Sequence, residues 1–126
     1  MTERKFNILT VDDELPIAWS IRFALGGPAR ALASAHNGEE ALARIQEQKP
    51  PFDLVITDNN MPLIDGLELV RRLRGQSFAG KIIVVSAHLS DEMQRAYREL
   101  NVDGMLSKPF NVNELRTAVD QLLAAA

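Results

Sequence analysis

Short, continuously apolar runs that alternate with longer segments of helical period constrain the fold of this chain most. The runs ILTV, LVIT and IIVV are rich in β-branched residues and show no regular alternation of apolar and polar side chains. A strand with one face in water would alternate, so these runs predict strands that helices cover on both faces. Strands and helices interleaved in this way predict an α/β fold with a doubly wound parallel sheet.

Five segments are predicted as strands by their apolar and β-branched residues and by the turn-forming residues around them. Their bounds are Phe6–Val11, Arg30–Ala35, Phe52–Thr57, Lys81–Ser86 and Gly104–Ser107.

Polar capping residues precede four of the predicted helices. An asparagine followed three residues later by glutamate occurs twice, and a serine followed by two carboxylates suits the positive end of a helix. The predicted caps are Asn37, Asp65, Ser90 and Asn111. Pro16 suits the first turn of a helix, so a further helix is predicted from Glu14 towards Gly26 and Gly27.

Composition excludes several classes of protein. The chain has 126 residues, 46% of them hydrophobic, which suits a single domain, 1–126, with its own core. Its formal charge of -3 comes from interleaved charges, which predicts no direct binding to nucleic acid. The chain has no cysteine, so a metal would need oxygen or histidine ligands. No run approaches the ~20 apolar residues of a membrane span, and we expect a cytoplasmic protein.

Polar side chains stand where the predicted strands end. Asp12 and Asp13 follow the first strand, Asp58 the third and Lys108 the fifth, and Ser86 closes the fourth. Because ligands of open parallel sheets bind at the carboxyl ends of the strands, we expect these side chains to converge. Two unit charges ~4 Å apart repel by about 4 kcal/mol at an effective dielectric of ~20, so three carboxylates predict a bound cation. Oxygen ligands with room for a phosphoryl group favour Mg²⁺.

This set of residues suits the transfer of a phosphoryl group to a carboxylate. Two carboxylates can hold the metal while a third attacks, and the Ser86 hydroxyl and Lys108 ammonium can contact phosphoryl oxygens. The hypothesis makes Asp58 the nucleophile, which becomes an acyl phosphate.

Four motifs resemble the response-regulator receiver domain of two-component signalling, in matching order and spacing. They are VDDE at 11–14, TDNNMPLIDG at 57–66, VVSA at 84–87 and LSKPF at 106–110. The resemblance covers essentially the whole chain. It implies a flavodoxin-like, five-stranded parallel sheet of order 2-1-3-4-5 flanked by five helices. It also implies a signalling phosphoacceptor that catalyses only its own phosphorylation and dephosphorylation.

The resemblance implies a role for each matching residue of the acidic cluster. Asp58 would be the phosphoacceptor, and Asp12 and Asp13 would hold Mg²⁺ together with Asp58 and the backbone carbonyl of Asn60. A separate hypothesis is that Asn60 and His88, close to this cluster, tune how fast the phosphoryl group is lost.

The resemblance further makes Ser86 the switch hydroxyl and Lys108 the charge partner of the phosphoryl group, with a cis peptide bond before Pro109. The chain departs from the family at Met105, where many receivers have an aromatic residue that swings inward. Methionine can move but is not aromatic, so the output step can be coupled to phosphorylation in a different way. Asn101 replaces a frequent glycine, and asparagine tolerates the left-handed conformation.

The resemblance to a receiver domain implies a protein that donates the phosphoryl group and a partner that recognises the phosphorylated conformation. The donor would be a sensor histidine kinase or a histidine phosphotransfer protein, and the reader a downstream protein or an effector domain, none of which is expected within this chain. The family's output surface, helix four to helix five, carries Tyr97, Met105 and Val112 and could also form a homodimer. On the first predicted helix, Trp19 and Phe23 form a stripe suited to donor docking, unless Trp19 folds over neighbouring side chains.

Two other classes use similar residues. A Mg²⁺-dependent phosphatase would usually place its nucleophile on the first strand in an Asp-x-Asp pattern, whereas this chain has Asp12 and Asp13 followed by Glu14. A receiver that only binds partners would lack part of the acceptor set, which is complete here. Asp53, Asp65 and Asp103 are interpreted as structural residues.

Overall fold

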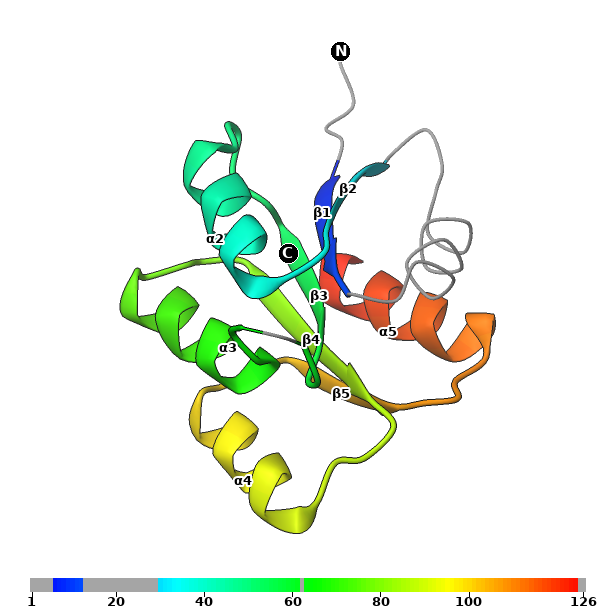
Figure 1. Ribbon diagram of the computed structural model, residues 1–126. Coiled ribbons are helices and arrows are strands. Elements are labelled where there is room, and N and C mark those ends of the chain that lie inside the picture. Colours follow the sequence, from blue (N-terminus) through cyan, green and yellow to red (C-terminus); the bar gives the residue numbers. More distant parts are fainter. Residues whose placement is uncertain (1–5, 13–29, 62, 125–126) are drawn as a thin grey trace.

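The structure, a computed structural model, describes residues 6–12, 30–61 and 63–124. Within them, five strands form one parallel sheet in the order β2-β1-β3-β4-β5, which confirms the predicted order (Figure 1). The strands are β1 (Phe6–Val11), β2 (Arg30–Ala35), β3 (Leu54–Asp58), β4 (Lys81–Ser86) and β5 (Gly104–Ser107). The helices are α2 (Gly38–Glu47), α3 (Gly66–Gly75), α4 (Asp91–Glu99) and α5 (Val112–Ala124).

The sheet is covered on both faces, as the uninterrupted apolar runs predicted. Figure 1 shows α2, α3 and α4 on one side of the sheet and α5 on the other. Leu9 and Val55 belong to the core cluster on the first side, whereas Ile8 and Leu54 belong to the cluster that contains Leu115 of α5. Successive strand residues therefore alternate between two apolar layers. The described residues hold four of the five expected helices; the helix predicted from Glu14 lies outside them.

The predicted bounds of the third strand were wrong at both ends. The strand runs over Leu54–Asp58, not Phe52–Thr57. Its ladder with β4 continues through the pair Asp58 and Val85, and the Asn59 N–H still donates to the Val85 carbonyl at 3.1 Å. The ladder therefore outlasts the apolar run, and Asp58 is the last residue of the strand instead of the first residue after it.

All four predicted caps are confirmed. Each side-chain oxygen accepts a hydrogen bond from the backbone N–H three residues further on, which satisfies one of the donors exposed at a helix start. The bonds are Glu40 N to Asn37 at 2.8 Å, Glu68 N to Asp65 at 2.9 Å, Met93 N to Ser90 at 3.2 Å and Glu114 N to Asn111 at 2.8 Å. These caps fix where each helix leaves the loop that follows a strand.

Two carboxylates interpreted as structural tie down the amino ends of strands. Asp53 Oδ2 accepts from the Asn7 N–H at 2.8 Å, and Asp103 Oδ2 accepts from the Ile82 N–H at 2.8 Å. Both bonds lie at the edge of the sheet opposite Asp58. They satisfy strand N–H groups there and take no part in the acidic cluster.

Gly66 opens α3 where this helix crosses the end of β3, and the close approach requires a residue without a side chain. A Cβ at Gly66 would lie 2.5 Å from the Asp58 carbonyl oxygen and 2.8 Å from the Asn59 Cα. We expect Gly66→Ala to lower the free energy of unfolding by about 1–3 kcal/mol, because backbone atoms must shift. Urea denaturation measures this change.

Gly75→Ala is the matched control at the other end of α3, where nothing lies within 4 Å of an added Cβ. We expect it to be neutral or to stabilise the protein by up to about 1 kcal/mol. Equal losses in the two variants would contradict the packing argument.

Candidate functional site

Two carboxylates are buried side by side at the carboxyl edge of the sheet. Asp12 directly follows β1 and is 2% exposed, and Asp58 ends the adjacent strand β3 and is 3% exposed. The strand register pairs Val11 with Thr57, so the two acidic residues occupy the next positions of both strands. Buried carboxylates are unfavourable unless they are paired, so their partners define the site.

Lys108 is a cation shared by both carboxylates. Its Nζ lies 3.3 Å from Asp12 Oδ2 and 3.3 Å from Asp58 Oδ2, and its side chain is 12% exposed. The backbone N–H of Lys108 donates to the Ser86 carbonyl at 2.8 Å, which holds the residue at the end of β5. Burial alone would lower the pKa of Lys108, but the charges of Asp12 and Asp58 and the hydrogen bonds to them outweigh it and raise that pKa.

Ser86 ends β4, beside the end of β3, and is fully buried. Its Oγ donates to the His88 carbonyl at 3.1 Å and accepts from the His88 N–H at 3.2 Å. The hydroxyl is therefore engaged within its own turn. The same two bonds fix the backbone of His88, whose side chain is exposed.

The second oxygen of Asp58 contacts the loop that follows β3. The Asn60 N–H donates to Asp58 Oδ1 at 3.3 Å, while Thr57 Oγ1 donates to the Asp58 carbonyl at 3.0 Å. Asp58 is thus held by its own loop on one oxygen and by Lys108 on the other. The sequence predicted that Asn60 would lie near Asp58, and the structure places its backbone next to the carboxylate.

A buried polar pair beside Asp58 was not predicted from the sequence. Asn59 is 3% exposed, and its Oδ1 accepts a hydrogen bond from the hydroxyl of Tyr97, which is fully buried in α4. Burial, followed by the nearby carboxylates of Asp65 and Asp58, raises the pKa of Tyr97 and keeps the phenol neutral. The signal available in the sequence was a lone tyrosine within a largely polar helix, DEMQRAYRE.

The remaining predicted residues are Met105, Asp13, Trp19 and Phe23. Met105 lies on β5, half-buried against the core cluster that contains Tyr97. Asp13, Trp19 and Phe23 lie outside the described residues. Within the described ranges, no group of three histidine or acidic side chains is close enough to hold a metal ion. No helix among them is long and apolar enough to cross a membrane.

The donor set at this edge fits Mg²⁺. Asp12 and Asp58 supply adjacent carboxylate oxygens, and the backbone of Asn60 adjoins them. Hard oxygen ligands of this kind are those that Mg²⁺ prefers, usually one or two carboxylates with several waters. The Lys108–Pro109 peptide bond is cis, which confirms the expectation for the lysine loop.

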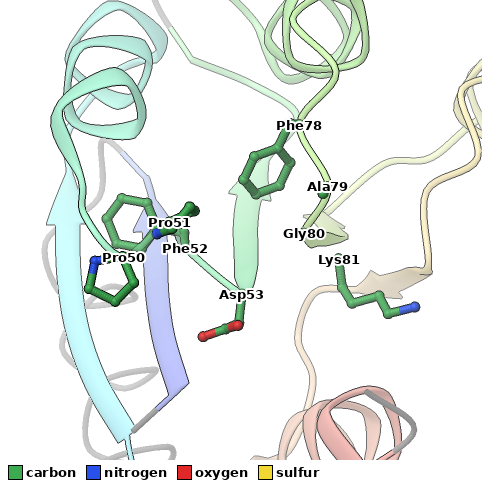
Figure 2. A pocket seen from close by; sticks show the side chains of 8 residues that line it. All are labelled: Pro50, Pro51, Phe52, Asp53, Phe78, Ala79, Gly80 and Lys81. Atoms are coloured by element: carbon green, nitrogen blue, oxygen red, sulfur yellow. The ribbon is translucent and has the colours of Figure 1, made fainter. Parts of the chain in front are cut away.

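A separate hollow of about 320 Å³ lies at the opposite edge of the sheet. It is lined by Pro50, Pro51, Phe52, Asp53, Phe78, Ala79, Gly80 and Lys81 (Figure 2). Asp53 directly precedes β3 and Lys81 begins β4, and a strand rises about 3.3 Å per residue. The hollow therefore lies a strand length away from Asp58 and plays no part in the chemistry of the carboxylates.

The model of the response regulator receiver domain family matches residues 8–120, and the chain belongs to this family of signalling domains. Among curated relatives, response regulator MprA of Mycobacterium tuberculosis is 36% identical over 116 residues, which are 92% of this chain and 50% of the relative. The two-component response regulator ORR41 of Oryza sativa is 32% identical over 117 residues, 91% of this chain and 92% of the relative. The chain thus spans about half of MprA and nearly all of ORR41.

Solved structures show the same fold. Chemotaxis protein CheY4 of Vibrio cholerae superposes with a TM-score of 0.85 at 30% identity, covering 94% of this chain and 98% of that chain. The receiver domain of an HD domain-containing protein from Pseudomonas fluorescens gives a TM-score of 0.89 at 26% identity, covering 97% of both chains. These comparisons confirm the resemblance that the four motifs indicated.

We expect Lys108→Met to lower the free energy of unfolding by about 2 kcal/mol at neutral pH, because two buried carboxylates lose a shared cation. The pKa of Lys108 is raised above its ordinary value of 10.5, so its contribution is fully present below pH 10.5 and is lost as pH rises through the folded pKa. Urea denaturation at pH 7 measures the loss.

The loss should be smaller when Lys108→Met is made in an Asp58→Asn background, since one of the two charges is then absent. Lys49→Met, at an exposed position, is the control and should change stability by less than about 0.5 kcal/mol. A Lys108→Met effect as small as that of Lys49→Met would show that the buried cation does not stabilise the fold.

Proposed function

We propose that this chain is a phosphoacceptor switch of a two-component phosphorelay. It takes a phosphoryl group from a phosphohistidine onto Asp58, in a Mg²⁺-dependent reaction, and then adopts a conformation that a partner reads. The observation that carries the proposal is the position of Lys108 Nζ, 3.3 Å from both Asp12 Oδ2 and Asp58 Oδ2. Such a compact group of buried charges at the ligand-binding edge of a parallel sheet favours a functional role.

In the proposed transfer, a carboxylate oxygen of Asp58 attacks the phosphorus of the phosphohistidine. The O–P bond forms as the P–N bond breaks, and the imidazole nitrogen keeps the electron pair of that bond. Lys108 contacts the oxygens of the transferred group and stabilises their negative charge without changing its own protonation. Attack by water on the phosphorus later releases phosphate and restores the Asp58 carboxylate, so that no separate substrate is turned over.

Asp12, Asp58 and the carbonyl of Asn60, together with Asp13, are the residues proposed to hold Mg²⁺. When bound, this ion neutralises phosphoryl charge and orients the group for in-line transfer. The oxygen donors at this edge are the hard ligands that Mg²⁺ prefers.

The switch is proposed to begin at Ser86. Its hydroxyl now donates to the His88 carbonyl at 3.1 Å, and it would donate to a phosphoryl oxygen on Asp58 instead. This exchange releases the turn after β4 and biases that turn between two conformations. Met105 on the adjacent β5 stands at the position where the resemblance implied an aromatic switch residue.

The proposed partners follow from the family. A sensor histidine kinase or a histidine phosphotransfer protein donates the phosphoryl group in the cytoplasm, and Trp19 and Phe23 help to dock it. Kinase binding that is unchanged by Trp19→Ala and Phe23→Ala would remove the docking part. The surface of α4, β5 and α5 is proposed to contact a downstream protein, an effector domain or a second copy of the chain.

The central prediction is a mass gain of one phosphoryl group when the protein is incubated with Mg²⁺ and acetyl phosphate. We expect the gain to disappear in Asp58→Asn, because this substitution removes the nucleophile. We also expect it to disappear when a chelator removes the required Mg²⁺. Intact-mass spectrometry makes the measurement.

If acetyl phosphate and a phosphohistidine donor both leave the wild-type mass unchanged, the chain is a binding module and not a phosphoacceptor. Hydrolysis of generic phosphate esters would instead favour the phosphatase class.

Asn60 and His88 are proposed to set how fast the phosphoryl group is lost. Both side chains are exposed next to the cluster, where they can control the access of water to the phosphorus. We expect the Asn60→Ala, His88→Ala double variant to change the dephosphorylation rate by about 3-fold or more, which corresponds to at least about 0.6 kcal/mol on the barrier. The mass of phosphorylated protein followed after donor removal gives this rate, and an unchanged rate would refute the assignment.

A further inference from the structure

A continuous chain of hydrogen bonds leads from the Asp58 carboxylate to α4. The Asn60 N–H donates to Asp58 Oδ1 at 3.3 Å, and Asn59 Nδ2 donates to Asn60 Oδ1 at 3.2 Å. The hydroxyl of Tyr97 then donates to Asn59 Oδ1. These bonds join the loop after β3 to a helix whose Tyr97 lies 38 positions further along the chain.

The last link of this chain is buried and closely packed. Tyr97 is fully buried and Asn59 is 3% exposed, so neither side chain can exchange its partner for water without opening the core. The Tyr97 hydroxyl also lies 2.8 Å from the position that a Cβ on Gly66 would take. It is thus fixed between the end of β3 and the start of α3.

Asn59 makes a second contact with the same helix. Its Nδ2 lies 4.0 Å from the Met93 sulfur, one turn of α4 before Tyr97. A displacement of the loop after β3 would therefore reach α4 at two successive turns. β5, with the sequence GMLS, offers no aromatic side chain for this purpose.

We propose that the hydrogen bond between Tyr97 and Asn59 transmits the phosphorylation state of Asp58 to α4, with Tyr97 as a positioning residue that acts through Asn59. This inference rests on the proposed phosphorylation of Asp58. A phosphoryl group on Asp58 changes the charge and shape next to the Asn60 N–H, and the hydrogen-bonded asparagine pair passes the displacement to the Tyr97 hydroxyl. Because unpaired buried polar groups are unfavourable, α4 moves with the loop to keep the bond.

Tyr97 is the only tyrosine of the chain, which makes the first test direct. Protein labelled with ¹³Cζ-tyrosine gives one phenolic carbon signal, and this signal reports the hydrogen bond of the hydroxyl. We expect it to shift when Mg²⁺ and acetyl phosphate are added to the wild type and to stay in place in Asp58→Asn. An unmoved signal in wild-type protein that has gained a phosphoryl group overturns the inference.

The second test measures the response of α4. Amide hydrogen exchange over Asp91–Glu99 is compared with and without acetyl phosphate in wild type, Tyr97→Phe and Asn59→Ala. Both variants break the same bond, one from each side, and Tyr97→Phe keeps the ring in the core. We expect the phosphorylation-dependent change in exchange to fall about 3-fold or more in each, while Tyr97→Phe still gains one phosphoryl group.

Ser34→Ala is the matched control, because it removes a side-chain hydrogen bond of 3.2 Å from Thr10 at the far edge of the sheet. It should retain the wild-type response of α4. A full response in Tyr97→Phe, or an equal loss in Ser34→Ala, overturns the inference while leaving phosphorylation of Asp58 intact. A wild type that gains no phosphoryl group overturns the proposed function and this inference together.

Discussion

The arrangement of this edge of the sheet depends on one cation between two buried carboxylates. Asp12 and Asp58 come from adjacent strands, and their mutual repulsion would favour separation of β1 and β3 at this end. Lys108 crosses from the end of β5 to contact both, so three strands meet in one charged contact. The same contact places the proposed acceptor, Asp58, next to a cation that can stabilise added negative charge.

Much of this arrangement could be predicted from local signals. Apolar runs without alternation place strands between two helical layers, and capping side chains such as Asn37 and Ser90 act within three residues. Once the strands are parallel and ordered, the residues that end them must share an edge, which brings Asp12, Asp58 and Lys108 together. The predicted end of the third strand was wrong because apolarity was used to place it, whereas the backbone ladder continues through Asp58.

The remaining features depend on polar contacts between residues that are distant in the sequence. Asn59 and Tyr97 are 38 positions apart, and neither belongs to a pattern that indicates its partner. Asp53 and Asp103 were interpreted as structural residues, but the strand N–H groups that they accept from follow only from the register of the sheet. Long-range polar pairing of this kind is specified by the packed fold, because burial decides which hydrogen bonds must form.

The location of Lys108 links the charged contact with Asp12 and Asp58 to the assembly of the whole sheet. Lys108 follows β5, an edge strand of four residues, Gly104–Ser107, none of them fully buried. Lys108 lies 96 positions from Asp12 in the sequence. Short edge elements open at lower free energy than the central strands. In a chain whose last strand has not docked, or has frayed, Asp12 and Asp58 lack the cation that they share in the folded state. In the proposed phosphorelay, native assembly of the sheet would thus act as a checkpoint, because only the folded chain holds Asp58 and Lys108 together.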